Sequence, residues 1–168
     1  MAEHTRESAV EAAFERVQAA VGKVATRHHL GPVGKVAAAR FAVACDTPPT
    51  LLDEDGLPGG RVPNLYLSSV LGWDAGRHEA ELRLDGTGGD VLTDLPLTGL
   101  RLMGVGQELT FGRPVLPDTD VLMEMSIDAV ERKEGRSGVL LLVTVLRRLV
   151  DAASGEELVS CRERFVGR

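Results

Sequence analysis

The residues that could do chemistry lie mainly in two stretches of the first half of the chain. In the first stretch, Asp46 follows an alanine-rich run over residues 32–45 and precedes Pro48 and Pro49. Its carboxylate could act as a general base or orient a substrate. It could instead end the preceding helix and bond backbone amides in an Asx-type turn. The residue types favour the structural role and leave the catalytic role open.

The second stretch is Gly-Arg-Val-Pro-Asn-Leu-Tyr, from Gly60 to Tyr66. It opens an apolar segment, residues 63–71, which we expect to form a largely buried helix that ends near Gly72. The first amides of a helix have no partner within it and carry partial positive charge, so an oxyanion placed here would be stabilised. Tyr66 is more typical of a core residue than of a catalyst. The candidate substrate-binding residues of this stretch are Gly60, Val62, Asn64 and Tyr66.

Other polar residues give weaker signals. Arg113 could hold the phosphate of a carrier group, or it could be solvated or paired with Asp118 or Glu134. The serines at 68–69 lack the Gly-x-Ser-x-Gly turn of an acyl-enzyme nucleophile. Adjacent histidines at 28–29 point in different directions and have no helical partner that would complete a metal site. The sequence therefore predicts no metal and no organic cofactor.

Composition and charge exclude several classes of protein. The length of 168 residues fits one domain, and the net charge of -6 argues against a nucleic-acid-binding surface. No apolar run approaches the ~18 residues of a membrane span. The N-terminal stretch carries acidic residues and is not a signal peptide. Cys45 and Cys161 form no metal-binding pattern. We expect a cytoplasmic protein that contacts neither nucleic acid nor membrane.

The hydrophobic pattern predicts helices first and strands afterwards. An amphipathic helix is expected over residues 7–24 and a second helix over residues 32–45, before the buried helix at 63–71. Residues 79–84 alternate only modestly. Strands are expected over residues 97–103, 107–111, 121–132, 139–150 and 157–166. Tight turns join the last three strands into an antiparallel meander, so the expected fold class is α+β.

Several segments together resemble the MaoC-like dehydratases. These are FAVACDTPP followed by LLDEDG, the helix entry GGRVP, and the most specific stretch, GVGQELTFGRPVLPDTDVLMEMSIDAVERKEGRSG. The resemblance covers about residues 22–167. It implies a single hot-dog domain over residues 1–168, with an extra N-terminal helix at 7–24 and a core at 25–168. In that fold a curved antiparallel sheet wraps around a central helix.

The resemblance also implies a substrate class and a partner. Members act on acyl groups carried by coenzyme A or acyl carrier protein, and they pair as homodimers or heterodimers with the active site at the junction. Their R-specific hydratases carry Gly-Asp-x-Asn-Pro-x-His, in which Asp and His form the catalytic dyad. Here Asp46 keeps the Asp, Pro48 replaces the Asn and Leu51 replaces the His. Leucine cannot transfer a proton, so the dyad is incomplete.

Three functions remain open at this point. The resemblance favours the dyad-deficient subunit of a (3R)-hydroxyacyl-thioester dehydratase or enoyl-thioester hydratase, which shapes the acyl pocket while a partner supplies the histidine. A second possibility is an independent hot-dog enzyme with altered chemistry, such as thioester hydrolysis or conjugate addition. A third is a non-catalytic acyl-binding module.

Overall fold

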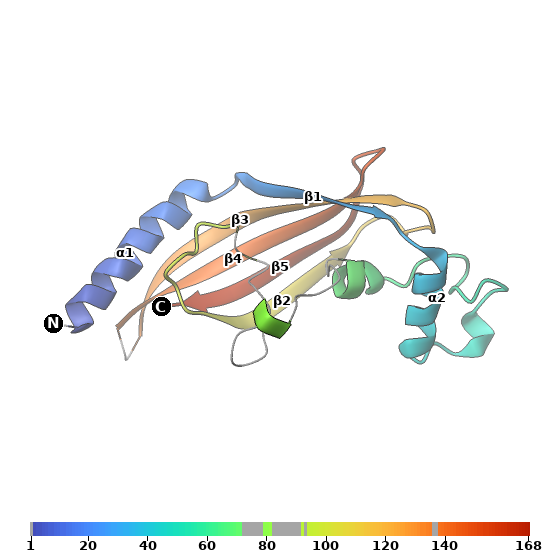
Figure 1. Ribbon diagram of the computed structural model, residues 1–168, viewed down its shortest axis with the longest axis horizontal. Coiled ribbons are helices and arrows are strands. Elements are labelled where there is room, and N and C mark those ends of the chain that lie inside the picture. Colours follow the sequence, from blue (N-terminus) through green and yellow to red (C-terminus); the bar gives the residue numbers. More distant parts are fainter. Residues whose placement is uncertain (1, 72–78, 82–91, 93, 136–137) are drawn as a thin grey trace.

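The structure is a computed structural model that describes residues 2–71, 79–81, 92, 94–135 and 138–168. Its largest element is a five-stranded antiparallel sheet with the strand order β1-β3-β4-β5-β2. The sheet is curved and carries few helices (Figure 1), in agreement with the expected hot-dog fold. The strands are β1 (Val24–Pro32), β2 (Leu102–Phe111), β3 (Asp120–Gly135), β4 (Gly138–Asp151) and β5 (Glu157–Gly167).

The predicted meander is confirmed, because β3, β4 and β5 follow one another and pair in sequence order. Alternate residues of β3 and β4 are buried, which is the pattern of strands with one face against a core. Val121, Met123 and Met125 of β3 and Val143 and Val145 of β4 belong to this buried set. Their side chains define the inner face of the sheet.

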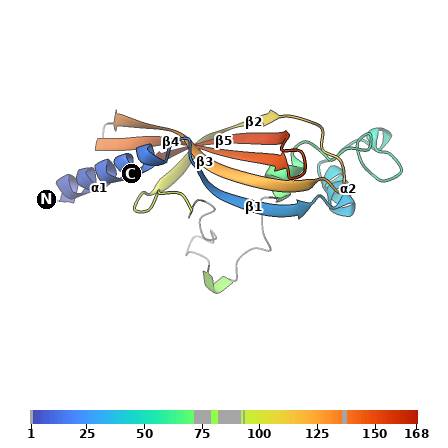
Figure 2. The same cartoon turned by 90° about the horizontal axis from the view of Figure 1, so that it is seen from above.

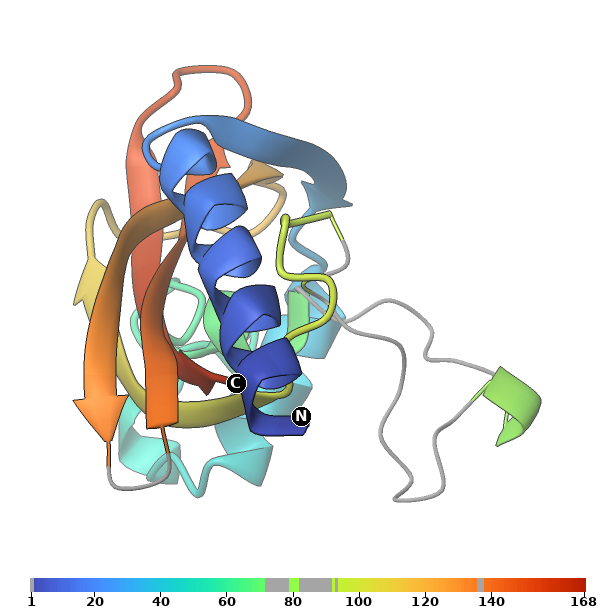
Figure 3. The same ribbon diagram turned by 90° about the vertical axis from the view of Figure 1, so that its left-hand side faces the viewer.

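The helices are α1 (Ala2–Ala20) and α2 (Lys35–Ala44), with the shorter η1 (Pro49–Leu51), η2 (Leu67–Leu71) and η3 (Glu79–Glu81). Seen from above, α1 and α2 lie at opposite ends of the strands (Figure 2). Figure 3 shows α1 in the foreground, along the inside of the curved strands. No helix in the described ranges is long and apolar enough to span a membrane.

Two hydrophobic clusters share the inner face, one at each end. The α1-end cluster consists of Val10, Ala13, Val17, Leu92, Leu95, Leu97, Met125, Ile127, Leu141, Val143 and Val145. The α2-end cluster consists of Val33, Ala38, Leu57, Val62, Tyr66, Leu67, Val115, Val121, Met123, Leu149, Leu158 and Val159. One sheet therefore supports two separate packing regions.

Strand β1 was not predicted, and the helix expected over residues 32–45 is the shorter α2, which begins at Lys35. Most β1 side chains are exposed, so the strand has no hydrophobic alternation that a sequence pattern could reveal. Its pairing with β3 defines it. The predicted N-terminal helix at 7–24 in fact ends at Ala20, and Gly22 then takes a positive φ of 75°.

Two further predictions differ from the structure. The strands expected at 97–103 and 107–111 form the single strand β2, with a register shift between Gly104 and Gly106. Residues 79–81 form a short helix, and the rest of the modestly alternating stretch lies outside the described residues.

The central helix expected at residues 63–71 is shorter than predicted. Its regular part is η2, a five-residue π-type helix, which begins four residues after Pro63. The predicted end at Gly72 lies outside the described residues. The segment is thus helical rather than extended, but Val62 and Pro63 belong to the loop that precedes it.

Candidate functional site

The loop between α2 and η2 holds most of the candidate residues, and Asp46 stands at its start. The backbone ends α2 in a Schellman motif: the Asp46 amide donates to the Val43 carbonyl at 3.0 Å, and the Thr47 amide donates to the Ala42 carbonyl at 3.1 Å. Asp46 takes the left-handed conformation, φ 57°, that this motif usually gives to glycine. Asp46 therefore ends the helix through its backbone.

The Asx-type turn expected at Asp46 is formed instead by Asp53. The Asp53 carboxylate accepts hydrogen bonds from the amides of Asp55, at 3.0 Å, and Leu57, at 2.9 Å. The Leu57 amide is the main reason that the pKa of Asp53 lies below its ordinary value, and the Asp55 and Gly60 amides lower the pKa further. Around Asp46, the described residues donate no hydrogen bond to the carboxylate, whose side chain is exposed.

The first amides of the Gly60–Tyr66 stretch already have partners within the protein. The Gly60 amide faces the Asp53 carboxylate. The Arg61 amide donates to the Pro58 carbonyl at 3.3 Å, and the Val62 amide donates to the Val115 carbonyl at 2.9 Å. The amides of residues 60–62 are therefore engaged within the chain, and the regular part of the helix begins only at Leu67.

The other candidate residues of this stretch divide into buried and exposed groups. Val62 and Tyr66 belong to the α2-end cluster, and the Tyr66 ring packs edge-on against Phe41 of α2, with ring centroids 5.5 Å apart. Burial raises the pKa of Tyr66, which keeps its hydroxyl protonated. Asn64 and Leu65 are exposed. Tyr66 and Val62 are therefore core residues, and Asn64 is exposed to solvent.

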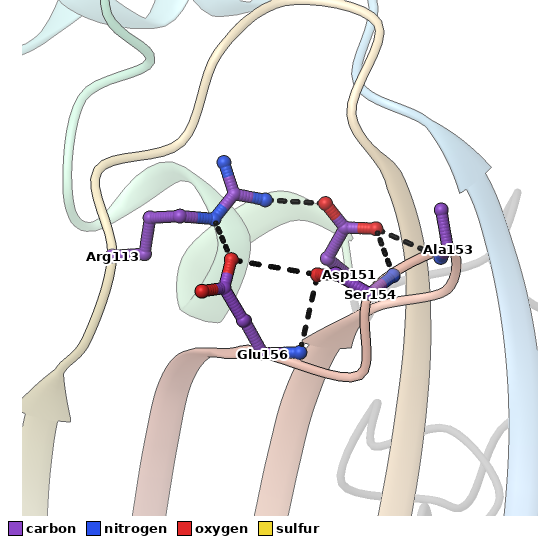
Figure 4. Close-up of polar contacts among 5 residues, drawn as sticks. All are labelled: Arg113, Asp151, Ala153, Ser154 and Glu156. Atoms are coloured by element: carbon purple, nitrogen blue, oxygen red, sulfur yellow. Dashed lines mark hydrogen bonds and ion pairs between the residues drawn. The ribbon is translucent and has the colours of Figure 1, made fainter.

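Arg113 joins two loops at the same end of the sheet (Figure 4). Its guanidinium forms ion pairs with Asp151 and, at 3.0 Å from Nε to Oε2, with Glu156. Both partners lie in the β4–β5 turn, whereas the sequence suggested Asp118 or Glu134. The Arg113 amide also donates to the Glu157 carbonyl at 3.1 Å. Two carboxylates thus already balance the positive charge that was expected to hold a phosphate.

The β4–β5 turn owes its shape to Asp151. The Asp151 Oδ1 atom accepts hydrogen bonds from the amides of Ala153, at 2.8 Å, and Ser154, at 3.2 Å. These two amides, and then the charge of Arg113, hold the pKa of Asp151 below its ordinary value. Asp53 and Asp151 were absent from the predicted site, although an aspartate two residues before a turn amide is a recognised sequence signal.

A chain of backbone contacts links these pieces. Arg113 fixes the segment that follows β2, and Val115 in that segment accepts the hydrogen bond from Val62. Val62 and Tyr66 pack against α2, and Asp46 lies just after the C-terminal end of that helix. The structure thus brings Val62, Tyr66 and Arg113 into one connected end of the sheet. Asp46 and Asn64 lie at the exposed margin of this end.

The residue aligned with the family's catalytic histidine is exposed and apolar. Leu51 lies in η1 and keeps 61% of its surface accessible. Histidines whose side chains the structure describes lie on β1, where His28 Nε2 is 3.5 Å from Asp94 and His29 Nε2 is 2.8 Å from Asp120. Over residues 45–66 no histidine is present at all.

Solved structures with a similar fold include a dehydratase complex and a hydratase. The ChsH1-ChsH2 complex from Mycobacterium tuberculosis contains a chain with a TM-score of 0.63 and 16% identity, covering 95% of this chain and 90% of that chain. The HadBC (3R-hydroxyacyl-ACP dehydratase) complex from the same organism has a TM-score of 0.52 and 17% identity, covering 84% of this chain and 90% of that chain. The (R)-hydratase from A. caviae has a TM-score of 0.50 and 18% identity, covering 85% of this chain and 95% of that chain. At such identities these matches establish the fold.

A family model identifies the chain more directly. No curated protein sequence matches it. The model described as "FAS1-like, dehydratase domain region" matches residues 19–160, which is most of the chain. The match spans β1 to β4 and the first residues of β5, together with α2 and the loop that carries Asp46. The chain belongs to this FAS1-like dehydratase-region family, of MaoC-like hot-dog fold.

Proposed function

We propose that this chain is the dyad-deficient subunit of a (3R)-hydroxyacyl-thioester dehydratase or enoyl-thioester hydratase, and that a second hot-dog subunit supplies the catalytic histidine. The observation that carries the proposal is the exposed Leu51 at the position of that histidine. An apolar side chain there can contact an acyl group but cannot move a proton.

Dehydration of a 3-hydroxyacyl thioester needs a base, an acid and donors for the developing oxyanion. In this chain Asp46 is the one carboxylate at a dyad position, and it stands alone in a helix-ending turn. The amides of Arg61 and Val62 are bonded to carbonyls of the chain itself. These features support a role in shaping the acyl site rather than in proton transfer.

The α2 end has the surface that such a role requires. A groove of about 520 Å³ runs along α2. Its apolar lining is Val36, Ala39 and Val43, and its charged lining is Lys35, Arg40, Glu54 and Asp55. This volume lies within the range of small-molecule sites, roughly 300–1,000 Å³. Val36 and Val43 each expose 65% of their surface and line the same groove. Exposed apolar residues that cluster, unlike single ones, commonly mark a binding surface. An acyl chain would cover this apolar surface. Lys35 is paired with Asp55, so Arg40 is the cation of this groove that could face a carrier phosphate.

Strand β2 is the surface that we assign to the second hot-dog subunit. It lies at the edge of the sheet, and most of its side chains are exposed. Met103, Val105 and Phe111 expose 64%, 48% and 42% of their surface. An edge strand has unpaired amide and carbonyl groups that can add a strand from another subunit. The apolar side chains would be buried in the same contact.

The test compares the purified chain with the chain co-expressed with a hot-dog protein that keeps both dyad residues. We expect enoyl-CoA hydration by the complex and none by the chain alone. Asp46→Asn should leave the rate of the complex within about twofold, as should the matched variant Asp118→Asn, whose residue is also left-handed at φ 63°.

Three results would contradict the proposal. Hydration by the chain alone that Asp46→Asn abolishes would make this chain a complete hydratase. Release of free thiol from an acyl thioester would indicate altered chemistry. Binding of acyl-CoA without turnover in the presence of any partner would indicate a non-catalytic module, with about 2.7 kcal/mol of stabilisation at a hundredfold excess of ligand over Kd.

A further inference from the structure

Two arginines face each other at the corner of the sheet where β2 begins and β5 ends. The Arg101 amide donates to the Arg168 carbonyl at 2.8 Å, and the Arg168 amide donates to the Arg101 carbonyl at 3.2 Å. Residues that exchange both backbone hydrogen bonds are directly opposite in an antiparallel pair, and their side chains point to the same face. Arg101 and Arg168, hereafter the opposed arginines, thus place two like charges side by side, which is destabilising unless an anion balances them.

The opposed arginines share the outer face of the sheet with apolar side chains. Val166 of β5 is opposite Leu142 of β4. The residues on either side of Leu142 are buried on the inner face, so Leu142 and Val166 point outward. Met103 of β2 is opposite Val166 and exposes 64% of its surface. The opposed arginines lie two residues beyond Met103 and Val166 on their strands, so they point outward as well.

A groove of about 380 Å³ opens beside these side chains. It is lined by Arg101, Leu102, Met103, Val166 and Arg168. Its volume lies within the range of small-molecule sites, roughly 300–1,000 Å³. Leu102 packs against the α1-end cluster, which places the groove at the α1 end of the strands (Figure 2). The groove is therefore separate from the one along α2, at the opposite end.

The opposed arginines differ in their ion pairs from the arginines within the strands. The strand arginines that pair with a carboxylate are Arg27, Arg132, Arg147, Arg148, Arg162 and Arg164. Glu124 even serves two of them, with Oε1 at 2.8 Å from Arg27 Nε and Oε2 at 3.2 Å from Arg148 Nη1. Within the part of the chain that the structure describes, the opposed arginines form no ion pair.

These features select a carboxylate that carries an apolar chain. Each carboxylate oxygen can accept hydrogen bonds from a guanidinium group, so one carboxylate can bridge two arginines, as Glu124 does. Beside the charges, Met103 and Val166 offer apolar surface that an alkyl chain would remove from water. The groove has room for one such molecule.

We propose that the opposed arginines and this groove bind a fatty-acid carboxylate, with its head group between the two guanidinium groups and its chain over Met103 and Val166. The inference goes beyond the proposed function, because the groove is remote from the one assigned to the acyl thioester. Met103 also belongs to the edge strand assigned to the second subunit. A side-chain carboxylate of that subunit is therefore the alternative occupant, and the experiment separates the two.

Calorimetric titration of the full chain with decanoate, decanol and acetate provides the test. Decanoate should bind about tenfold more tightly than decanol, which lacks the charge, and than acetate, which lacks the chain. The double variant Arg101→Gln/Arg168→Gln should weaken decanoate binding by about tenfold or more, because it removes charge-assisted hydrogen bonds. Both side chains are exposed, so the variant should fold. The α2 groove contains neither arginine, so this loss identifies the site.

The matched control is Arg162→Gln/Arg164→Gln, which removes two paired positive charges from the same face. It should leave decanoate affinity within about twofold. Equal binding of decanoate and decanol, or equal weakening by the control, would overturn the inference.

Another result would assign the opposed arginines to the second subunit and likewise overturn the inference. In that case the chain would bind none of the probes, and the double variant would weaken its complex with a hot-dog partner. None of these results bears on enoyl-CoA hydration by the complex, so the proposed function stands or falls separately.

Discussion

The two ends of the inner face are held together in different ways. At the α1 end, α1 places Val10, Ala13 and Val17 against β3 and β4, and the cluster contains only apolar side chains. Val17 and Val145 are completely buried. Burial of apolar surface, at about 25 cal/mol per Å², is therefore the main stabilising term at this end.

At the α2 end, carboxylates hold much of the backbone in place. Asp53 accepts two amide hydrogen bonds in one loop, and Asp151 accepts two in another while it pairs with Arg113. Large apolar side chains stay exposed at this end, among them Val43 and Leu51. Loops held by hydrogen bonds can keep their conformation while apolar side chains beside them stay exposed. The α1 end therefore stabilises the fold, and the α2 end leaves apolar surface for a ligand or a subunit.

The largest effect is expected from a charge placed in the α1-end cluster. Val17→Asp would bury a carboxylate without a partner, which should lower the free energy of unfolding by roughly 3 kcal/mol or more. That is a large part of the ~5–15 kcal/mol that stabilises a domain. Denaturant unfolding followed by circular dichroism measures the change.

Gln18→Asp is the matched control, since Gln18 is the next residue of α1 and is exposed. Its effect should stay within about 0.5 kcal/mol. If Val17→Asp and Gln18→Asp unfolded at the same denaturant concentration, α1 would not stabilise the sheet. The contrast between the two ends would then be lost.

A smaller effect, dependent on pH, is expected at the α2 end. The pKa of Asp151 in the folded chain lies below its ordinary value of 3.8, because the Ala153 and Ser154 amides bond to the ionised form. The folded state therefore favours the carboxylate more than the unfolded state does. This stabilisation is fully present above the ordinary pKa and is lost as pH falls through the lower, folded-state pKa.

Asp151→Asn should therefore lower Tm at neutral pH, and the difference from the wild type should shrink as the solution is acidified below pH 3.8. Thermal unfolding over a series of pH values tests this. Asp46→Asn is the control, because its carboxylate accepts no hydrogen bond from the described residues. A Tm difference that grew in acid would show that the ionised Asp151 does not stabilise the turn.

The strongly patterned parts of the chain were predictable from the sequence. Strands β3 and β4 show alternating burial, and short turns join β3, β4 and β5; alternation and turn residues can both be recognised in a sequence. The family resemblance, assigned to about residues 22–167, agrees with the matched range of 19–160. Strand β1 could not be predicted from a hydrophobic pattern, because its side chains are mostly exposed and only its pairing with β3 defines it.

The site was harder to predict, because its contacts join distant segments. Arg113 meets Asp151 and Glu156 only after β4 and β5 have paired, so its partners could not be inferred from spacing. The Val62 amide donates to the Val115 carbonyl, although Val115 lies more than fifty residues later in the chain. This contact occupies an amide that was expected to be free at a helix N-terminus. Local rules identified these residues as important but not the bonds that they make.

The smallest expected effect concerns Asp46, and its sign distinguishes the two roles of that residue. Asp46 has a φ of 57°, a conformation that costs less for glycine than for aspartate. Asp46→Gly should therefore stabilise the chain by up to about 1 kcal/mol. Asp118→Gly, at φ 63° on another loop, should behave in the same way and serves as the matched control. Chemical denaturation measures both.

Activity of the two variants in the complex completes the comparison. If Asp46 only ends α2, both glycine variants keep the hydration rate of the complex, and the α2 end contributes shape alone. If Asp46→Gly raises stability but removes activity while Asp118→Gly does not, the carboxylate of Asp46 takes part in the reaction. The strained backbone would then be the cost of holding that carboxylate at the exposed end of α2, and the histidine alone would come from the partner.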